Sequence, residues 1–223
     1  MGAVIGDILP LALGIAISPI PVIAAILMLL SPRARVTSVG FLLGWVLGIV
    51  VAVTVFTLLA AIIPAADPDA SAPVRGVVQL VLGALLLLVA VAQWRKRPKA
   101  GEEPVMPKWM QAIDKVGFPA ALGLGFLLSA LNPKNLLLAA GAGVDVGSAA
   151  LDVGAIVVVI AVFTVLAAST VLVPVVGYLV AAEKLRGPLD TLRVWLAKEN
   201  AVIMAVLLLV IGVSMIGKGI ASF

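Results

Sequence analysis

The sequence predicts an all-α integral membrane protein with six transmembrane helices, arranged as two inverted three-helix repeats in which the first and fourth helices are broken. Three observations predict this class: an apolar composition, six runs of membrane-spanning length, and two pairs of similar segments in the two halves. Of the 223 residues, 63% are hydrophobic and only 12% are charged, whereas a soluble domain has about 25% charged residues. The absence of Cys and His excludes disulfide frameworks, zinc sites and Ser-His or Cys-His catalysis.

The predicted helices are runs without charged residues, except that the fourth contains Lys134: 8–32, 36–66, 76–94, 116–144, 153–182 and 200–217. A helix needs about 20 apolar residues to cross the hydrocarbon core, and each run is about that long or longer. The first run has no basic stretch before it and exceeds the apolar part of a signal peptide. We therefore expect it to remain as a helix of the mature protein.

The Lys and Arg residues are distributed unevenly between the predicted loops. Twelve of them fall in the loops after the first, third and fifth helices, whereas the opposite side holds only Arg75 and Lys218. Positively charged loops stay on the cytoplasmic side of a membrane. The asymmetry therefore predicts that these three loops are cytoplasmic and that both termini lie outside.

The segment 95–115 is predicted to be a cytoplasmic basic linker between a first repeat, 1–94, and a second repeat, 116–223. It begins with a basic cluster: Arg95, Lys96 and Arg97. Setting the membrane topology explains this cluster, and direct contact with anionic lipid headgroups is the alternative.

Two pairs of segments are similar between the halves. Residues 9–14 and 118–123 are identical at four of six positions, and residues 55–61 and 162–168 at six of seven, at offsets of 109 and 107. Because each half has three helices, the second copy must enter the membrane from the opposite face. The sequence thus predicts an inverted repeat, an arrangement typical of secondary transporters.

Prolines interrupt the first and fourth predicted helices. Ser18, Pro19 and Pro21 lie near the middle of the first run, and Asn132-Pro133-Lys134-Asn135 lies slightly past the middle of the fourth. Proline removes a backbone donor and clashes with the carbonyl four residues earlier, so we expect both helices to be broken. Broken helices at comparable places in two inverted halves indicate a transport site.

Lys134 is the charged residue that the apolar runs do not explain. A lysine at the centre of a membrane helix costs about 2.5–3.5 kcal/mol on insertion scales, and no acidic residue lies within the runs to pair with it. Asp145 follows at about 15 Å along a helix, too far for the side chain to reach that membrane surface. Lys134 must then lose its proton, face an anion or wet cavity, or bond to carbonyls freed at Pro19 and Pro21.

The predicted substrate site combines both breaks with two hydroxyls of the second and fifth helices: Ser18, Pro19, Pro21, Thr57, Asn132, Pro133, Lys134, Asn135 and Thr164. Thr54, Ser169 and Thr170 are further hydroxyls on those helices. The alternative for these hydroxyls is a bond to the backbone of their own helix. No metal site or cofactor is predicted, because the runs contain no carboxylate, His or Cys.

These motifs resemble those of the lysine-exporter (LysE) superfamily of six-helix transporters. The resemblance rests on Pro-Ile-Pro at 19–21, Asn-Pro-Lys at 132–134 and the basic loop between the halves. Amino-acid exporters of that superfamily carry Pro-Gly-Pro in the first helix. Together with the segments 132–136 and 41–45, the Pro-Ile-Pro sequence is more similar to the GAP branch, the peptidoglycolipid- or sulfolipid-addressing (Sap-like) proteins.

The resemblance implies a transporter or flippase that moves an anionic lipid or glycolipid by alternating access across the cytoplasmic membrane of actinobacteria-like cells. Lys134, with Asn132 and Asn135, would bind the phosphate or sulfate of the headgroup. Two alternatives remain: an exporter of amino acids or small organic acids, and a non-transporting scaffold for lipid export machinery. An enzyme is not expected, since no carboxylate pair, His or Cys lies in an apolar run. Membrane lipids are the expected partners, nucleic acid is not, and homo-oligomerisation stays open.

Overall fold

The computed structural model describes residues 1–62, 73–97, 113 and 116–223, and its regular elements there are all helices. They are α1 (Gly2–Ala16), α2 (Pro19–Leu30), α3 (Ala34–Ala60), α4 (Pro73–Arg95), α5 (Phe118–Ala130), α6 (Pro133–Gly147) and α7 (Val153–Ile220). The all-α prediction is confirmed for these residues. Most of the predicted linker 95–115 lies outside them.

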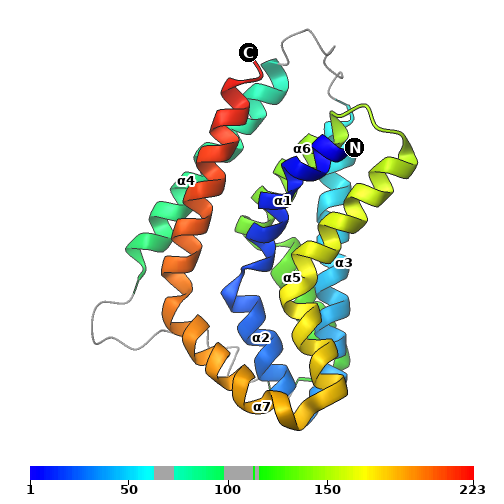
Figure 1. The fold of residues 1–223 in the computed structure, drawn as a ribbon, viewed down its shortest axis with the longest axis vertical. Helices are drawn as coiled ribbons and strands as arrows, with labels where there is room; N and C mark the ends of the chain where they lie inside the picture. Colours follow the sequence, from blue (N-terminus) through cyan, green and yellow to red (C-terminus); the bar gives the residue numbers. More distant parts are fainter. Residues whose placement is uncertain (63–72, 98–112, 114–115) are drawn as a thin grey trace.

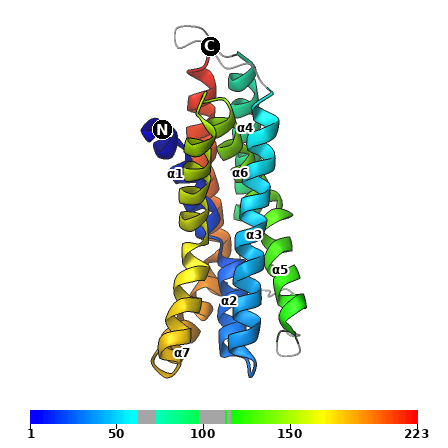
Figure 2. The ribbon, with the colours of Figure 1, turned by 90° about the vertical axis from the view of Figure 1, so that its right-hand side faces the viewer.

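The two predicted helix breaks are confirmed. α1 and α2 meet at an angle of 53°, and α5 and α6 at 61°. The two bent pairs run in opposite directions: α1 lies toward the end of the bundle that holds both chain termini, whereas α5 lies toward the other end (Figures 1 and 2). This is the relation that an inverted repeat requires.

Several of these helices can cross a membrane. α3, α4 and α7 are each long and apolar enough, and counting each bent pair as one span gives five candidate spans in the described part of the chain. Large apolar side chains such as Leu58, Val180 and Val210 are exposed on the outside of the bundle. A soluble monomer rarely exposes so much apolar surface, so the bundle is suited to lipid surroundings.

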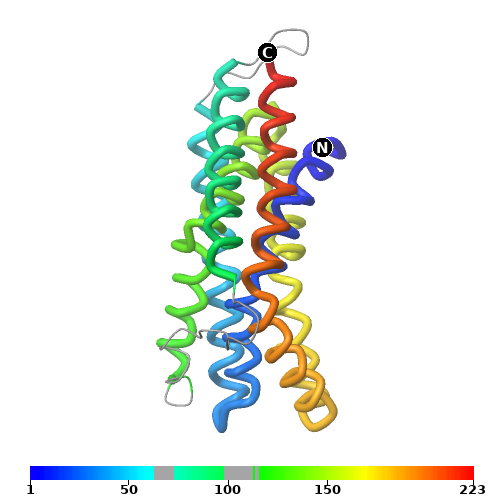
Figure 3. Tube along the Cα trace, turned by 90° about the vertical axis from the view of Figure 1, so that its left-hand side faces the viewer, coloured from blue at the N-terminus to red at the C-terminus, as the bar shows by residue number. Residues whose placement is uncertain are grey.

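The helix α7 has 68 residues and turns back toward the end at which it starts (Figure 3). We expected a basic loop between 182 and 200, but the backbone departs from helical angles only at Ala181 (φ −140°, ψ 52°). The leucines at 185, 189, 192 and 196 follow helical spacing, and Leu189 and Leu196 are buried. Counting uncharged runs missed this amphipathic stretch, because its charges lie on the opposite face of a helix.

Glycines allow α3 and α5 to pack closely. A Cβ added at Gly44 would overlap the backbone carbonyl of Leu122, and one at Gly40 would lie 2.9 Å from the carbonyl oxygen of Phe118. A Cβ at Gly48 would overlap the Ser129 hydroxyl. The four-residue spacing of these glycines brings the two backbones together, as small residues do between membrane helices.

A second glycine contact joins α4 to the returning half of α7. A Cβ at Gly76 would lie 2.9 Å from the carbonyl oxygen of Gly219, and the converse distance is also 2.9 Å. Gly83 and Gly212 are related in the same reciprocal way, at 2.9 and 3.1 Å. The antiparallel helices α4 and α7 thus touch through matched glycines.

The similar segments of the two halves do not occupy equivalent positions in the helices. Thr57 is 23 residues beyond the start of α3 at Ala34, whereas its sequence match, Thr164, is 11 residues beyond the start of α7 at Val153. The bent pairs, not these short matches, therefore give the structural basis for proposing a repeat.

Candidate functional site

The break between α1 and α2 leaves carbonyl groups of α1 without partners in their own helix. Ser18 has an extended backbone (φ −98°, ψ 100°), and Pro19 follows as the first residue of α2. A helix that ends leaves its last carbonyls unpaired, and two of these, at Gly14 and Ala16, are bonded by side chains from other helices. The break is therefore held by tertiary contacts.

Lys134 provides the first of these contacts. Its Nζ donates a hydrogen bond of 2.7 Å to the carbonyl oxygen of Gly14, and the side chain is 6% exposed. A positive group is favourable at the negative C-terminal end of α1. The lysine is thus bonded to a carbonyl on the α1 side of the break, not to the carbonyls at Pro19 or Pro21 considered above.

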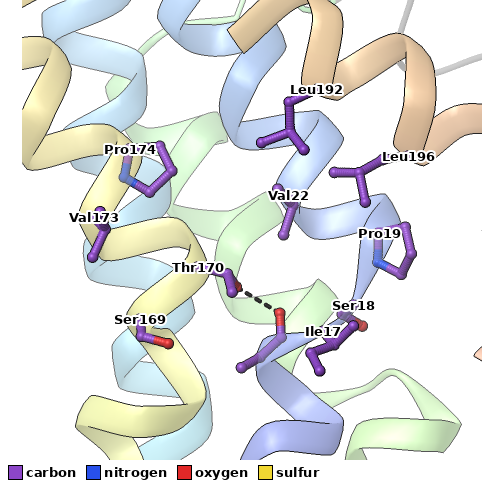
Figure 4. Close-up of a pocket in the computed structure, with 11 residues that line it drawn as sticks. Ile17, Ser18, Pro19, Val22, Ser169, Thr170, Val173, Pro174, Leu192 and Leu196 are labelled. Atoms are coloured by element: carbon purple, nitrogen blue, oxygen red, sulfur yellow. Dashed lines mark hydrogen bonds between the residues drawn. The ribbon is translucent and has the colours of Figure 1, made fainter. Parts of the chain in front are cut away.

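Thr170 provides the second contact, from the descending half of α7. Its Oγ1 donates a hydrogen bond of 2.5 Å to the carbonyl oxygen of Ala16 (Figure 4). The neighbouring Ser169 bonds instead to Leu166 in its own helix, at 2.7 Å. Of these two candidate hydroxyls, Thr170 therefore links α7 to the break.

The break between α5 and α6 is stabilised by its own asparagines. The Asn132 side chain accepts a hydrogen bond of 3.1 Å from the backbone N–H of Lys134, which caps α6. Asn135 donates from Nδ2 to the carbonyl oxygen of Leu128, at 3.0 Å, in the last turn of α5. The Asn135 Oδ1 is buried without a hydrogen-bond partner among the described residues, so it can accept a bond from another group.

A cavity of about 380 Å³ lies beside the first break, between α2 and both halves of α7 (Figure 4). Its polar lining side chains are Ser18, Ser169 and Thr170, and the rest of the lining is apolar. Leu192 and Leu196, from the amphipathic stretch of α7, close one side. Counting uncharged runs along the sequence did not identify these two leucines as buried or lining residues, although their helical spacing could have done so.

An apolar groove lies next to this cavity. It has a volume of about 570 Å³, lies between α1 and the returning half of α7, and shares Ile17 with the cavity. Leu13, Val206 and Val210 line it and are 48%, 52% and 63% exposed. The groove therefore opens on the outer surface of the bundle.

Of the predicted site residues, only Ser18 and Pro19 line this cavity, and Lys134, Asn132 and Asn135 do not. Pro21 is buried in α2 outside the lining, and Thr57 bonds to Val53 of its own helix at 2.8 Å. Thr164 is buried without a hydrogen-bond partner in the described chain, and it does not line the cavity either. Pro133 begins α6 next to Lys134.

The basic cluster at the end of α4 is exposed to the surroundings: Arg95, Lys96 and Arg97. The guanidinium carbon of Arg97 lies 4.2 Å from the centre of the Trp94 ring. Tryptophan is enriched at membrane–water interfaces, and a cation over its ring is attracted to it.

A charged network that the sequence did not predict lies at the end of the bundle that holds both termini. Asp145 of α6 is 3% exposed and pairs with Arg75 of α4 and Lys218 of α7, each at 3.2 Å. Gln79 donates to the same carboxylate at 2.9 Å, and Lys218 also pairs with Asp7 of α1 at 2.7 Å. The network joins four helices at this end. The distribution of charges along the sequence indicated only that these groups lie on one side of the membrane.

The broken helices, the buried lysine between them and the apolar outer surface define a multi-pass helical membrane protein. A family model matches residues 8–221, nearly the whole chain, and its description is Sap, sulfolipid-1-addressing protein. The chain belongs to this family, as the sequence motifs suggested. No curated protein and no solved structure matches the chain significantly.

Proposed function

We propose that this protein moves a lipid with an anionic headgroup across the cytoplasmic membrane by alternating access. The observation that carries the proposal is the contact of Lys134 with Gly14, where the two broken helices meet beside an apolar cavity. Membership of the sulfolipid-1-addressing family supports a sulfated glycolipid as the substrate class. The protein is not proposed to be an enzyme.

The cavity and groove fit the apolar part of a lipid. Both are lined almost wholly by apolar side chains, they share Ile17 as a lining residue, and the groove is open along the outside of the bundle. An acyl chain can enter sideways from the bilayer and remain in apolar surroundings throughout. Among the described residues the polar side chains of the cavity are three hydroxyls, so it offers no charged or amide group to bind a whole amino acid.

Lys134 is the proposed ligand of the headgroup. An ammonium group has three donors, and in the described part of the chain its Nζ bonds only to the Gly14 oxygen. A sulfate or phosphate oxygen can replace that carbonyl or bond to a free donor, and the Ser18 and Thr170 hydroxyls lie near the same break. We propose that Asn132 and Asn135 hold the second break in position for this contact.

The proposed cycle requires six membrane spans, arranged as two inverted repeats. The helix α7 supplies two of these spans. The Asp145 network joins α1, α4, α6 and α7 and closes the end with the termini, which we propose faces outward. Opening this end requires separating Asp145 from Lys218 or Arg75. In a non-transporting scaffold, Lys134 would serve only to hold the break between α1 and α2 through its bond to Gly14.

The test uses purified protein in phosphatidylcholine vesicles with fluorescently labelled sulfatide or phosphatidylcholine, and dithionite quenching to follow movement between leaflets. We expect the wild type to move sulfatide faster than phosphatidylcholine. Lys134→Ala should reduce sulfatide movement about tenfold or more, the effect of losing one charged hydrogen bond, and Lys134→Arg should retain part of it. Lys198→Ala, at an exposed lysine, is the matched control. Normal movement by an inserted Lys134→Ala variant would contradict the proposal.

A further inference from the structure

A further pocket, of about 500 Å³, lies at the end of the bundle opposite the Asp145 network. One wall is the short turn between α2 and α3, with Arg33, and the start of α3, with Arg35. The other wall is α7 around its bend, with Tyr178 and Arg186. Figure 1 shows α2 and the bend of α7 next to each other at this end.

Three arginine residues therefore line one pocket, although about 150 residues separate Arg35 from Arg186 in the chain. Among the described residues, no acidic side chain lines it, and the ion pairs involve other cations: Arg75, Arg193 and Lys218. Cytoplasmic topology explains why arginines occur at this end, as it explains Arg95 and Arg97. It does not explain why three of them converge on a concave site.

The pocket walls are fixed by hydrogen bonds. The Ser31 hydroxyl donates to the carbonyl oxygen of Met28 at 2.8 Å, and Thr37 donates to that of Arg33 at 3.1 Å. The Arg186 Nη2 donates to the hydroxyl oxygen of Tyr178 at 3.4 Å, and Tyr178 is 4% exposed.

Guanidinium groups bind sulfate and phosphate oxygens through paired hydrogen bonds. We propose that this arginine pocket, defined by Arg33, Arg35, Arg186 and Tyr178, binds the sulfate or phosphate group of an anionic lipid. The inference rests on the proposed function and adds a place where the headgroup binds before it reaches Lys134. The shared chemistry is a tetrahedral oxyanion, carried by a lipid headgroup or by a free ion.

The test measures binding without transport. The full-length chain in detergent micelles is titrated with sulfatide, and bound lipid is counted by native mass spectrometry. Replacing all three arginines by Gln should weaken binding about tenfold or more. The matched control removes three positive charges from the stretch of α7 around Arg186, at residues that do not line the pocket: Lys184→Gln, Arg193→Gln and Lys198→Gln. We expect the control to bind sulfatide as the wild type does.

Replacing the three arginines by Lys keeps the charge and tests the geometry, with binding expected between that of the wild type and the Gln variant. This variant also covers the case in which the Gln variant fails to fold. Equal losses in the pocket and control variants, or no loss in either, would overturn the proposal. Binding of sodium sulfate that depends on the three arginines, without arginine-dependent binding of sulfatide, would assign the pocket to a free ion and contradict a lipid site. If Lys134→Ala loses transport but binds sulfatide as the wild type does, the binding measured here belongs to the arginine pocket and not to Lys134.

Discussion

Replacing Asp145 should destabilise the end of the bundle that holds both termini. The Asp145 carboxylate is 3% exposed and pairs with two cations, so Asp145→Asn leaves Arg75 and Lys218 without it. Breaking a buried ion pair costs about 3–5 kcal/mol. Arg75 is 31% exposed and can turn to water, and Lys218 keeps Asp7 at 2.7 Å. We therefore expect the lower end of that range, about 3 kcal/mol.

The assay is reversible unfolding in mixed micelles by titration with sodium dodecyl sulfate. Asp145→Asn, Lys218→Met and the double variant form a double-mutant cycle, which isolates the energy of this pair. Asp190→Asn is the control, because its pair with Arg193 is exposed on α7 and contributes little. Unfolding of Asp145→Asn at the wild-type detergent fraction, or strictly additive effects in the cycle, would refute the reasoning.

Three further variants test the packing and the cavity. Gly44→Ala should prevent α3 from reaching α5 and reduce the yield of folded monomer in size-exclusion chromatography, whereas Gly123→Ala, with open space around it, should not. Thr170→Val should lower the free energy of unfolding by about 1 kcal/mol through the lost hydrogen bond to α1, and Thr170→Ser should restore it; equal stability of all three proteins would contradict this role. Leu196→Trp should fill part of the cavity and slow sulfatide movement in vesicles, while Val194→Trp, on the exposed face of the same stretch, should leave the rate unchanged.

The helix breaks could be predicted because their cause is local. Proline lacks a backbone donor wherever it occurs, so the sequence around Pro19 and Pro133 predicted both bends. The prediction that Lys134 needs a partner follows from the cost of a charge in lipid. Its partner, the Gly14 carbonyl, could not be chosen from sequence, because any carbonyl near either break was a candidate.

Other features depend on tertiary contacts that a single pass along the sequence does not show. Thr170 and Thr164 have the same chemistry and lie on the same helix, but only Thr170 faces the break at Ala16. Likewise, Arg33 and Arg186 were counted only as topology signals, because their convergence depends on how α7 bends at Ala181.

The central claim is tested most directly by measuring whether Lys134 contacts a lipid phosphate or sulfate. Solid-state NMR of the ¹⁵N-lysine-labelled protein in phosphatidylglycerol bilayers can detect ¹⁵N–³¹P dipolar coupling, and the difference from Lys134→Met assigns the signal. The proposed function predicts coupling between the Lys134 Nζ and lipid phosphorus. An Nζ that stays bonded to the Gly14 carbonyl and shows no coupling, in a protein that still moves anionic lipid, would contradict it.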